Sequence, residues 1–362
     1  MRDDAFWMSR ALRLAEKGRG RTRPNPLVGA VVVRKGKKVG EGFHAYFGGS
    51  HAETVALQKA GSRAKGAALY VTLEPCSSWG KTPPCVDFVI SSGVKRVVIG
   101  SPDPNPENHR LGIQQLKKAG LQVRLEVLAE EVKKQNESFF KAMRTGLPFV
   151  TLKMAQSLDG KIASRTGDSR WISSKVSRLF VHRLRDEADA VLVGKNTAFQ
   201  DNPRLQGSEG QEKPWRVVLD PDLELPGKAR LFGGPQLTFV AVSEKKLLRI
   251  SRSPAQKRNG RTLLPLPEKK GKLELKSLLR QLALLGVQSL LVEGGGEVAW
   301  SLIQDRLADR LIWIVAPKIV GGRSAKTSVE GEGIQQLEKA FALRWEKVYR
   351  SGEDWVFEAT PL

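Results

Sequence analysis

Three side chains that can bind a metal ion occur in the first quarter of the chain, together with one carboxylate. His51 and Glu53 are separated by a single residue in GGSHAETVALQKAG, and the two cysteines of the chain are Cys76 and Cys85. Imidazole and thiolate are ligands that Zn²⁺ prefers, and three protein ligands leave a tetrahedral ion with one open position, as in catalytic zinc sites. The pattern therefore predicts one zinc ion per chain, held by His51, Cys76 and Cys85.

Glu53 is the residue expected to act on a water molecule at the open position. Zinc lowers the pKa of a bound water toward about 7, and Glu53 would take its proton and pass it to a leaving amine. The order His-x-Glu followed by Pro-Cys is typical of zinc deaminases, although eight residues rather than two separate Cys76 from Cys85 here. The alternative is a histidine at a helix start and two inert, buried thiols.

A second candidate site lies in LLVEGGGEVAWSLI, residues 290–303. An apolar strand runs into three glycines and then a helix, and helix N-termini bind phosphate groups through free backbone amides. The glycines fit a loosened dinucleotide-binding pattern, but the acidic residue expected after the next strand is missing, which argues against a first Rossmann unit. A tight strand-to-helix turn without a ligand is the alternative.

Alternating strands and helices are predicted to position the metal ligands. Strands are predicted over residues 27–33, 39–43, 68–75 and 95–100, and helices over 51–60, 84–93 and 113–120. This alternation predicts a layered α/β domain. His51 and Cys85 then lie at helix starts and Cys76 at a strand end, where the three can converge. A helix N-terminus also favours a thiolate.

A domain boundary is predicted where a charged helix, expected from Glu130 to Thr145, ends at Gly146-Leu147-Pro148. The predicted domains are residues 1–146 and 147–362. Strands of the second domain are expected to begin with the alternating residues from Val150 and to continue at 188–194, 215–220, 237–242, 289–293 and 311–316. With helices between several of them, a mostly parallel sheet is expected. The polar stretches 206–214 and 251–272 are predicted to be loops.

Composition limits the class of protein and of ligand. The chain has 362 residues, enough for two cores, and a net charge of +22 from basic residues spread along its length. Such a charge attracts phosphorylated metabolites, dinucleotides or nucleic acid, or is simply a solvated surface. No 18-residue apolar run occurs, and the amphipathic first residues lack the apolar core of a signal peptide. We therefore expect a cytoplasmic protein without a membrane partner.

Four stretches of the first domain carry a resemblance to a known family: TRPNPLVGAVVV, GEGFHAYFGGSHAE, TLEPCSSWGKTPPC and DPNPENHRLGI. They resemble the deaminase half of the bifunctional riboflavin-biosynthesis deaminase/reductase family, over nearly all of residues 1–145. The resemblance implies a three-layer, cytidine-deaminase-like fold. It also implies hydrolytic deamination of 2,5-diamino-6-ribosylamino-4(3H)-pyrimidinone 5′-phosphate, with Asn25 and His44 in the base pocket. A turn role for Asn25 and a packing role for His44 stay open.

The second domain resembles the reductase half of the same family over most of residues 148–325, through KMAQSLDGKIA, GDSRWIS, HRLRDEADAVLVGKNTAFQDNPRL, VEGGGEVAWSLI and APKIVGG. The resemblance implies a dihydrofolate-reductase-like α/β fold and an NADPH-dependent reduction of the ribosyl group to ribityl. The implied cofactor contacts are Ala155, Trp171, Thr197, Asp201, Gly295, Gly296, Glu297, Val298, Ala299, Trp300 and Ser301. The implied substrate contacts are Ser169, Arg185, Leu205 and Glu293, with Arg185 offering a forked donor for phosphate.

The chain departs from the family pattern at three places. Ser78 stands where the family usually has histidine, and Asn108-His109-Arg110 replaces a small, glycine-bearing turn. After Leu205 the family usually continues Thr-x-Arg, and that arginine binds the substrate phosphate. Here Ser208 takes its place, and Arg204 or Arg216 is a possible substitute. These departures bear on affinity and rate rather than on reaction type.

Two functions follow as alternatives. The first is an enzyme with two active sites that acts on a small phosphorylated pyrimidine, without a nucleic-acid partner and, by resemblance, as a homo-oligomer. The second is a deaminase of tRNA or single-stranded nucleic acid with an accessory domain, which the net charge of +22 would suit. The long cysteine spacing and the second domain with its glycine turn favour the first.

Overall fold

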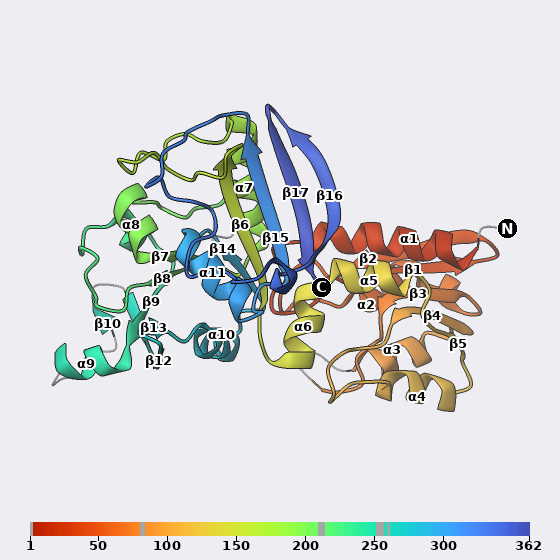
Figure 1. The fold of residues 1–362 in the computed structure, drawn as a ribbon. Coiled ribbons are helices and arrows are strands. Elements are labelled where there is room, and N and C mark those ends of the chain that lie inside the picture. The colour runs from red at the N-terminus through yellow and green to blue at the C-terminus, as the bar shows by residue number, and fades with distance from the viewer. Residues whose placement is uncertain (1–2, 80–83, 209–213, 251–256, 259–260) are drawn as a thin grey trace. The chain divides into compact units, whose positions relative to one another are not determined.

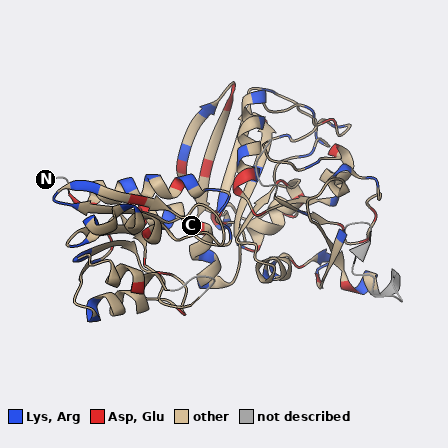
Figure 2. Ribbon diagram, turned by 180° about the vertical axis from the view of Figure 1, so that it is seen from behind, with Lys and Arg blue, Asp and Glu red and all other residues tan. Residues whose placement is uncertain are grey.

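The computed structural model describes residues 3–79, 84–208, 214–250, 257–258 and 261–362 (Figure 1). The chain divides into two compact units, Met1–Gly146 and Leu147–Leu362. Each unit has a sheet of its own and buried cores of its own, so each can be described by itself. Lys and Arg residues are scattered over the elements of both units (Figure 2).

The first unit is built on a five-stranded sheet in the order β2-β1-β3-β4-β5. Its strands are β1 (Gly29–Arg34), β2 (Lys37–Phe43), β3 (Ala68–Leu73), β4 (Arg96–Ser101) and β5 (Gln122–Arg124). β1 pairs with β2 and β3 in antiparallel fashion, whereas β3, β4 and β5 are parallel. Successive side chains of β1 are buried on opposite faces, because both faces of the sheet are covered.

Helices cover both faces of this sheet and give three layers. They are α1 (Asp4–Ala15), α2 (Ala52–Ala60), α3 (Cys85–Ser91), α4 (Leu111–Lys118), α5 (Ala129–Gln135) and α6 (Glu137–Thr145). One core contains buried residues of α2, α3 and α4, and the core on the opposite face contains those of α1. The N-terminus of α1 is capped by the Asp3 carboxylate, which accepts the amide of Phe6. The three-layer fold expected from the sequence is confirmed.

The single helix predicted from Glu130 to Thr145 is wrong, because two helices, α5 and α6, meet at Asn136. Asn136 is buried, and its side chain is bound to the backbone of Leu27. The amide of Leu27 donates to Asn136 Oδ1 at 2.7 Å, and Asn136 Nδ2 donates to the Leu27 carbonyl at 3.0 Å. The helical periodicity continues across Asn136, so the sequence pattern does not reveal a break that a long-range contact imposes.

The second unit is built on a ten-stranded sheet in the order β10-β11-β9-β8-β7-β14-β6-β15-β17-β16. Its strands are β6 (Phe149–Ser157), β7 (Ala190–Gly194), β8 (Trp215–Leu219), β9 (Thr238–Ser243), β10 (Lys257–Arg258), β11 (Arg261–Leu266), β14 (Ser289–Val292), β15 (Arg310–Ala316), β16 (Leu343–Ser351) and β17 (Asp354–Pro361). Every pairing from β11 through β15 is parallel. The expectation of a mostly parallel sheet is confirmed, and an antiparallel hairpin, β16 with β17, extends it.

Helices pack on both faces of this second sheet as well. They are α7 (Lys175–Glu187), α8 (Lys195–Asp201), α9 (Glu244–Ile250), α10 (Leu275–Leu284) and α11 (Gly296–Gln304). One large core joins apolar residues of α10 and α11 to the sheet, and two others on the opposite face include residues of α7 and α8. A separate two-stranded ribbon, β12 (Glu268–Lys269) with β13 (Lys272–Leu273), precedes α10.

The prediction of a loop over residues 251–272 is wrong for its later part, since β11 pairs in parallel with β9. Leu264 and Leu266 of this strand are buried, which explains why the segment joins the sheet despite its basic flanks. Pro265 has no N–H to donate. It is tolerated because the neighbouring strand β10 pairs only with Arg261 and Thr262, and so does not extend along β11 as far as Pro265. Residues 251–256 and 259–260, and residues 209–213 of the other predicted loop, lie outside the described residues.

Candidate functional site

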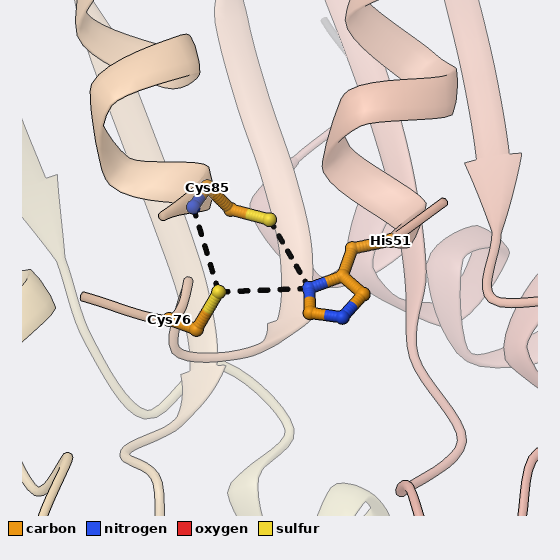
Figure 3. A group of neighbouring side chains, drawn as sticks. All are labelled: His51, Cys76 and Cys85. Atoms are coloured by element: carbon orange, nitrogen blue, oxygen red, sulfur yellow. Dashed lines mark hydrogen bonds between the residues drawn. The ribbon is translucent and has the colours of Figure 1, made fainter. Parts of the chain in front are cut away.

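The three predicted metal ligands meet at the ends of three elements (Figure 3). His51 is the N-cap of α2, Cys85 is the first residue of α3, and Cys76 follows β3. His51 Nδ1 lies 3.1 Å from Cys85 Sγ and 3.6 Å from Cys76 Sγ. The ligand atoms of the three residues all lie within 4.8 Å of one another. One nitrogen and two sulfurs in this arrangement fit a zinc ion that keeps an open position.

The surroundings of Cys76 favour its thiolate. The Cys76 sulfur accepts the backbone amide of Cys85, at the start of α3, over 3.4 Å. Hydrogen bonding from the Cys85 thiol and the nearby His51 lower the pKa of Cys76, whereas the same hydrogen bond and burial raise the pKa of Cys85. A cysteine that is readily deprotonated is the form that coordinates zinc. Cys76 is therefore not the inert, apolar thiol of the alternative interpretation.

Glu53 lies one half-turn into α2 and is buried, with 3 % of its surface exposed. Its Oε2 atom has no hydrogen-bond partner among the described residues. Burial raises the pKa of Glu53, while His51 acts in the opposite direction. A buried carboxylate oxygen without a partner is costly in a folded protein, and it indicates a ligand or water that this carboxylate is placed to contact.

A cavity of about 310 Å³ opens onto these residues and includes Asn25 and His44, both expected in the base pocket. Asn25 Nδ2 lies 3.1 Å from His44 Nε2, and His44 Nδ1 lies 3.2 Å from the carbonyl of Ser50. His44 is buried, which lowers its pKa and favours the neutral ring. Its ring meets that of His51 edge-on, with centroids 5.4 Å apart. The structure thus brings both residues to the cavity.

Two of the departures from the family pattern also meet at this cavity. Ser78 Oγ donates a hydrogen bond to Asn108 Oδ1 over 2.8 Å, and both residues line the cavity. Sequence reasoning missed two further lining residues, Glu74 and Asp103. Glu74 accepts the amides of Asp103, Arg110 and Ile113, and so holds the loop that carries Asn108. The position of Glu74 in TLEPC, two residues before the metal ligand Cys76, could have indicated its role.

A second cavity, of about 700 Å³, lies in the second unit, and a half-buried ionic cluster forms part of its lining. Glu293 follows β14, and the pairing of β14 with β6 brings it beside Lys153. Lys153 Nζ lies 3.1 Å from Glu293 Oε2, and the Arg185 guanidinium donates to both carboxylate oxygens, over 2.5 and 2.9 Å. The sequence left Lys153 either as a solvated strand residue or as one that helps to orient the substrate, and the structure makes it part of this cluster.

The cavity collects the remaining predicted substrate residues and several cofactor residues. Those lining it are Ala155, Ser169, Trp171, Arg185, Thr197, Asp201, Leu205, Glu293 and Gly295. Ser169 Oγ donates to Asp201 Oδ1 over 2.6 Å. Arg185 Nη1 also donates to the carbonyl of Gln206. Because Glu293 and Gln206 already occupy its guanidinium, Arg185 is better suited to holding Glu293 than to binding a phosphate group.

The structure separates the two candidate substitutes for the missing phosphate arginine. Arg204 is exposed and lines the cavity. Arg216 is 1 % exposed and donates to the carbonyls of Gly233 and Gln236. The suggestion that Arg216 binds the substrate phosphate is therefore wrong, because its guanidinium donates to the backbone of the segment that precedes β9, at Gly233 and Gln236. The sequence could not reveal this, since β8 carries Arg216 inward beside apolar residues.

A third cavity, of about 610 Å³, adjoins the glycine turn at the start of α11. Gly295 is the N-cap of this helix, and no side chain caps its first turn, which leaves backbone amides for a phosphate group. A Cβ atom on Gly296 would lie 2.5 Å from the carbonyl oxygen of Thr327, so close packing also requires a glycine there. The turn therefore fits the diphosphate of a dinucleotide.

The predicted cofactor residues of α11 divide into two groups. Gly295, Gly296, Glu297, Val298 and Ser301 line the third cavity. Ala299 and Trp300 do not: Ala299 is fully buried in the core, and the Trp300 ring packs against Phe341 with centroids 6.1 Å apart. Successive residues of a helix point in directions about 100° apart, so the side chains of a continuous run cannot all face one cavity. The prediction of cofactor contacts for every residue from Gly295 to Ser301 is therefore wrong for the side chains of Ala299 and Trp300.

Family models match both units. The cytidine and deoxycytidylate deaminase zinc-binding region matches residues 1–101, and the RibD C-terminal domain matches residues 148–357. Among curated proteins, the chain is 43% identical over 355 residues to riboflavin biosynthesis protein RibD of Aquifex aeolicus, covering 98% of this chain and 97% of that protein. It is 39% identical over 365 residues to RibD of Escherichia coli, covering 97% of each.

Solved structures agree over the whole length. Acinetobacter baumannii RibD, in its first form, superposes with a TM-score of 0.90 at 34% identity, and 99% of each chain is covered. A diaminohydroxyphosphoribosylaminopyrimidine deaminase/5-amino-6-(5-phosphoribosylamino)uracil reductase from Thermotoga maritima superposes with a TM-score of 0.88 at 38% identity, again covering 99% of each chain. Within the described residues, no helix combines the length and the apolar character needed to cross a membrane.

Proposed function

From the premise that this chain belongs to the RibD family, and so is a bifunctional deaminase and reductase of riboflavin biosynthesis, we propose how its cavities divide the two reactions. Residues 1–146 carry the zinc-dependent deaminase, and residues 147–362 carry the NADPH-dependent reductase. The substrate is that of the Thermotoga maritima relative, a diamino-hydroxy-pyrimidine bearing a ribosyl phosphate. The match over nearly the full length favours this substrate over tRNA or single-stranded nucleic acid, which the net charge of +22 would also suit.

In the deaminase cavity, His51, Cys76 and Cys85 would hold the zinc ion. When bound, zinc supplies a Lewis acid that makes a water molecule acidic near neutral pH. Glu53, whose Oε2 atom lacks a partner among the described side chains, takes the proton of that water and delivers it to the departing amine. Asn25 and His44 line the same cavity and hold the pyrimidine ring.

In the reductase cavities, the turn at Gly295 and Gly296 receives the diphosphate of NADPH, which supplies the hydride. Ser169, Thr197 and Asp201 line both the second and the third cavity, so cofactor and substrate meet there. Glu293, fixed by Arg185 and Lys153, orients the ribosyl group. Arg204, exposed at the second cavity, binds the substrate phosphate in place of the arginine that the family carries at the position of Ser208.

The observation that carries the deaminase proposal is the convergence of three ligands beside Glu53, whose Oε2 atom has no partner among the described residues. Replacement Glu53→Gln keeps the shape of the side chain and removes the base. Ammonia release should fall by a factor of about 10²–10⁴, while metal analysis still finds one zinc ion per chain. Glu107→Gln, on an exposed position of the loop that lines the cavity, is the matched control. Loss of zinc from Glu53→Gln would instead make Glu53 a structural residue.

Two expectations remain predictions, of which the first rests on the sequence pattern and the second on the resemblance to the family. One is a cytoplasmic location, and the other is a homo-oligomeric state. Sedimentation of the purified full-length chain measures the second directly, and a monomer at micromolar concentration would contradict it.

A further inference from the structure

The third cavity has one end that adjoins the substrate and one end that does not. Ser169, Thr197, Asp201 and Gly295 line both it and the substrate cavity. On the proposed function, the nicotinamide ring must lie against this shared wall, because hydride transfer needs contact with the substrate. With the diphosphate at the glycine turn, the adenosine half of the cofactor must extend to the unshared end. The lining that the substrate cavity does not share includes Lys195, Leu219, Pro221 and Gly271 to Leu273, and it also includes the basic residues Arg165 and Lys326.

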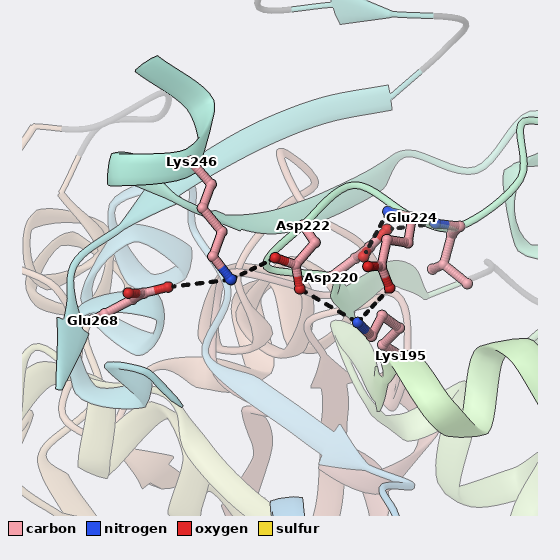
Figure 4. A network of polar contacts seen from close by, with 7 residues as sticks. Lys195, Asp220, Asp222, Glu224, Lys246 and Glu268 are labelled. Atoms are coloured by element: carbon pink, nitrogen blue, oxygen red, sulfur yellow. Dashed lines mark hydrogen bonds and ion pairs between the residues drawn. The ribbon is translucent and has the colours of Figure 1, made fainter. Parts of the chain in front are cut away.

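A turn that carries acidic side chains, Asp220 to Glu224, follows β8 at this unshared end (Figure 4). The Asp220 carboxylate accepts the amides of Glu224 and Leu225, over 3.0 and 2.9 Å, and so fixes the turn. Lys195 Nζ lies 2.6 Å from Glu224 Oε2 and 3.4 Å from Asp222 Oδ2. The turn thus places two carboxylates on a lysine that lines the cofactor cavity.

A second lysine belongs to the same network, whose net charge stays negative. Lys246 pairs with Asp222 and lies 3.8 Å from Glu268. The drawn network therefore opposes two ammonium groups with three carboxylates, in addition to Asp220 (Figure 4). It is a locally acidic site in a chain whose net charge is +22. Carboxylates near the adenosine ribose favour a free 2′-hydroxyl, whereas basic side chains favour a 2′-phosphate.

We propose that Lys195, Asp222 and Glu224 form the site that reads the 2′-position of the adenosine ribose, and that this reductase consequently discriminates weakly between NADPH and NADH. Lys195 is the group that contacts a 2′-phosphate. Asp222 and Glu224 compete with that phosphate for the lysine, and they accept a hydrogen bond from a 2′-hydroxyl. The proposal rests on the reductase function proposed above and concerns which dinucleotide serves it.

The test is calorimetric binding of NADPH and NADH, and of adenosine 2′,5′-bisphosphate and 5′-AMP, to the full-length protein. The last two probes lack nicotinamide, so their affinities do not depend on turnover. For the unaltered protein, the dissociation constants of NADPH and NADH should lie within about tenfold of each other. Lys195→Gln should weaken NADPH and adenosine 2′,5′-bisphosphate by about tenfold, the value of one hydrogen bond between charged groups, and leave NADH and 5′-AMP unchanged.

The double replacement Asp222→Asn with Glu224→Gln should act in the opposite direction, strengthening NADPH by about tenfold relative to NADH. The matched control is Lys228→Gln, which removes an exposed lysine between β8 and β9 that does not line the third cavity. It should leave the ratio of the two affinities unchanged.

Equal weakening of both dinucleotides by Lys195→Gln would overturn the proposal, and so would an unaltered protein that prefers NADPH by more than a thousandfold. If neither dinucleotide bound while ammonia release persisted, the assignment of the reductase would fail together with the proposal. That outcome is distinct from tight binding of both cofactors with no response to the substitutions.

Discussion

Glu293 is the residue on which the ionic cluster of the reductase cavity depends. Burial by itself would raise its pKa, but the charges of Arg185 and Lys153 lower the pKa of Glu293 well below its usual range. Its carboxylate is therefore ionised in the folded protein at neutral pH. Removing it would leave two cations enclosed without a counter-charge.

We expect Glu293→Gln to lower the free energy of unfolding at pH 7 by about 3–5 kcal/mol. The effect should depend on pH in a definite direction. Because the folded state holds this proton less tightly than the unfolded chain, the stabilisation is complete above the ordinary glutamate pKa of about 4.3 and is lost as the pH falls below it. Urea denaturation of both proteins at pH 7 and pH 4 measures this difference, which should shrink at pH 4.

The control for this measurement is Glu338→Gln, which removes a carboxylate from an exposed position. It should leave the unfolding curve unchanged at both pH values. A Glu293→Gln protein as stable as the original at pH 7 would show that the cluster does not hold the cavity together.

Replacement of Arg204 is expected to change only the KM of the reductase, whereas replacement of Arg185 is expected to change the melting temperature as well. Arg204 is exposed at the cavity, so Arg204→Ala should raise the KM of the reductase for its phosphorylated substrate by about tenfold, the value of one charge-assisted contact, without changing the melting temperature. Arg185→Ala should lower the melting temperature as well, because it leaves Glu293 with one cation fewer. An unchanged KM for Arg204→Ala would exclude Arg204 as the phosphate ligand.

At the scale of elements, the junction of α5 and α6 is tied to the deaminase cavity through Asn136. Its side chain holds the backbone of Leu27, next to Asn25 and Pro26, which line the cavity. Asn136→Ala would leave a buried amide and a buried carbonyl of Leu27 without partners. We expect a loss of about 2–3 kcal/mol of stability, together with a raised KM for the deaminase and an unchanged reductase.

Thermal unfolding and the two separate assays check this prediction. Lys133→Ala in α5 removes a surface ion pair with Glu130 and serves as the control. Exposed ion pairs contribute little to the free energy of unfolding. If Asn136→Ala unfolds normally but also loses reductase activity, the effect is not local to the cavity.

The elements that the sequence predicted well are those with a strong local pattern. The strands leading to Cys76 and to Glu293, and the helix starts at His51 and Cys85, follow from apolar runs and their neighbouring turns. The break at Asn136, the strand β11 and the inward course of Arg216 depend on contacts between residues distant in the chain. Patterns of neighbouring residues carry no information about such contacts.

At the scale of the whole molecule, the cavities belong to separate units. The residues lining the deaminase cavity all come from the first unit, and those lining the second and third cavities all come from the second. Removal of zinc by a chelator should therefore abolish ammonia release while NADPH consumption on the supplied deaminated intermediate continues. Restoring zinc should recover ammonia release, and simultaneous loss of both activities on chelation would contradict separate sites.

The place of β17 in the second sheet has a consequence for the folding of this chain during its translation. β17 lies between β15 and β16, although it is the last described strand in chain order. The first unit is continuous in the chain, so it can acquire its structure while the ribosome is still adding later residues. β15 cannot pair with β17 until β17 has left the ribosome. Until then, one edge of β15 is unpaired and exposed in the nascent chain. Premature termination before Asp354 should thus yield a polypeptide that chaperones retain, with a competent deaminase attached to an aggregation-prone remainder.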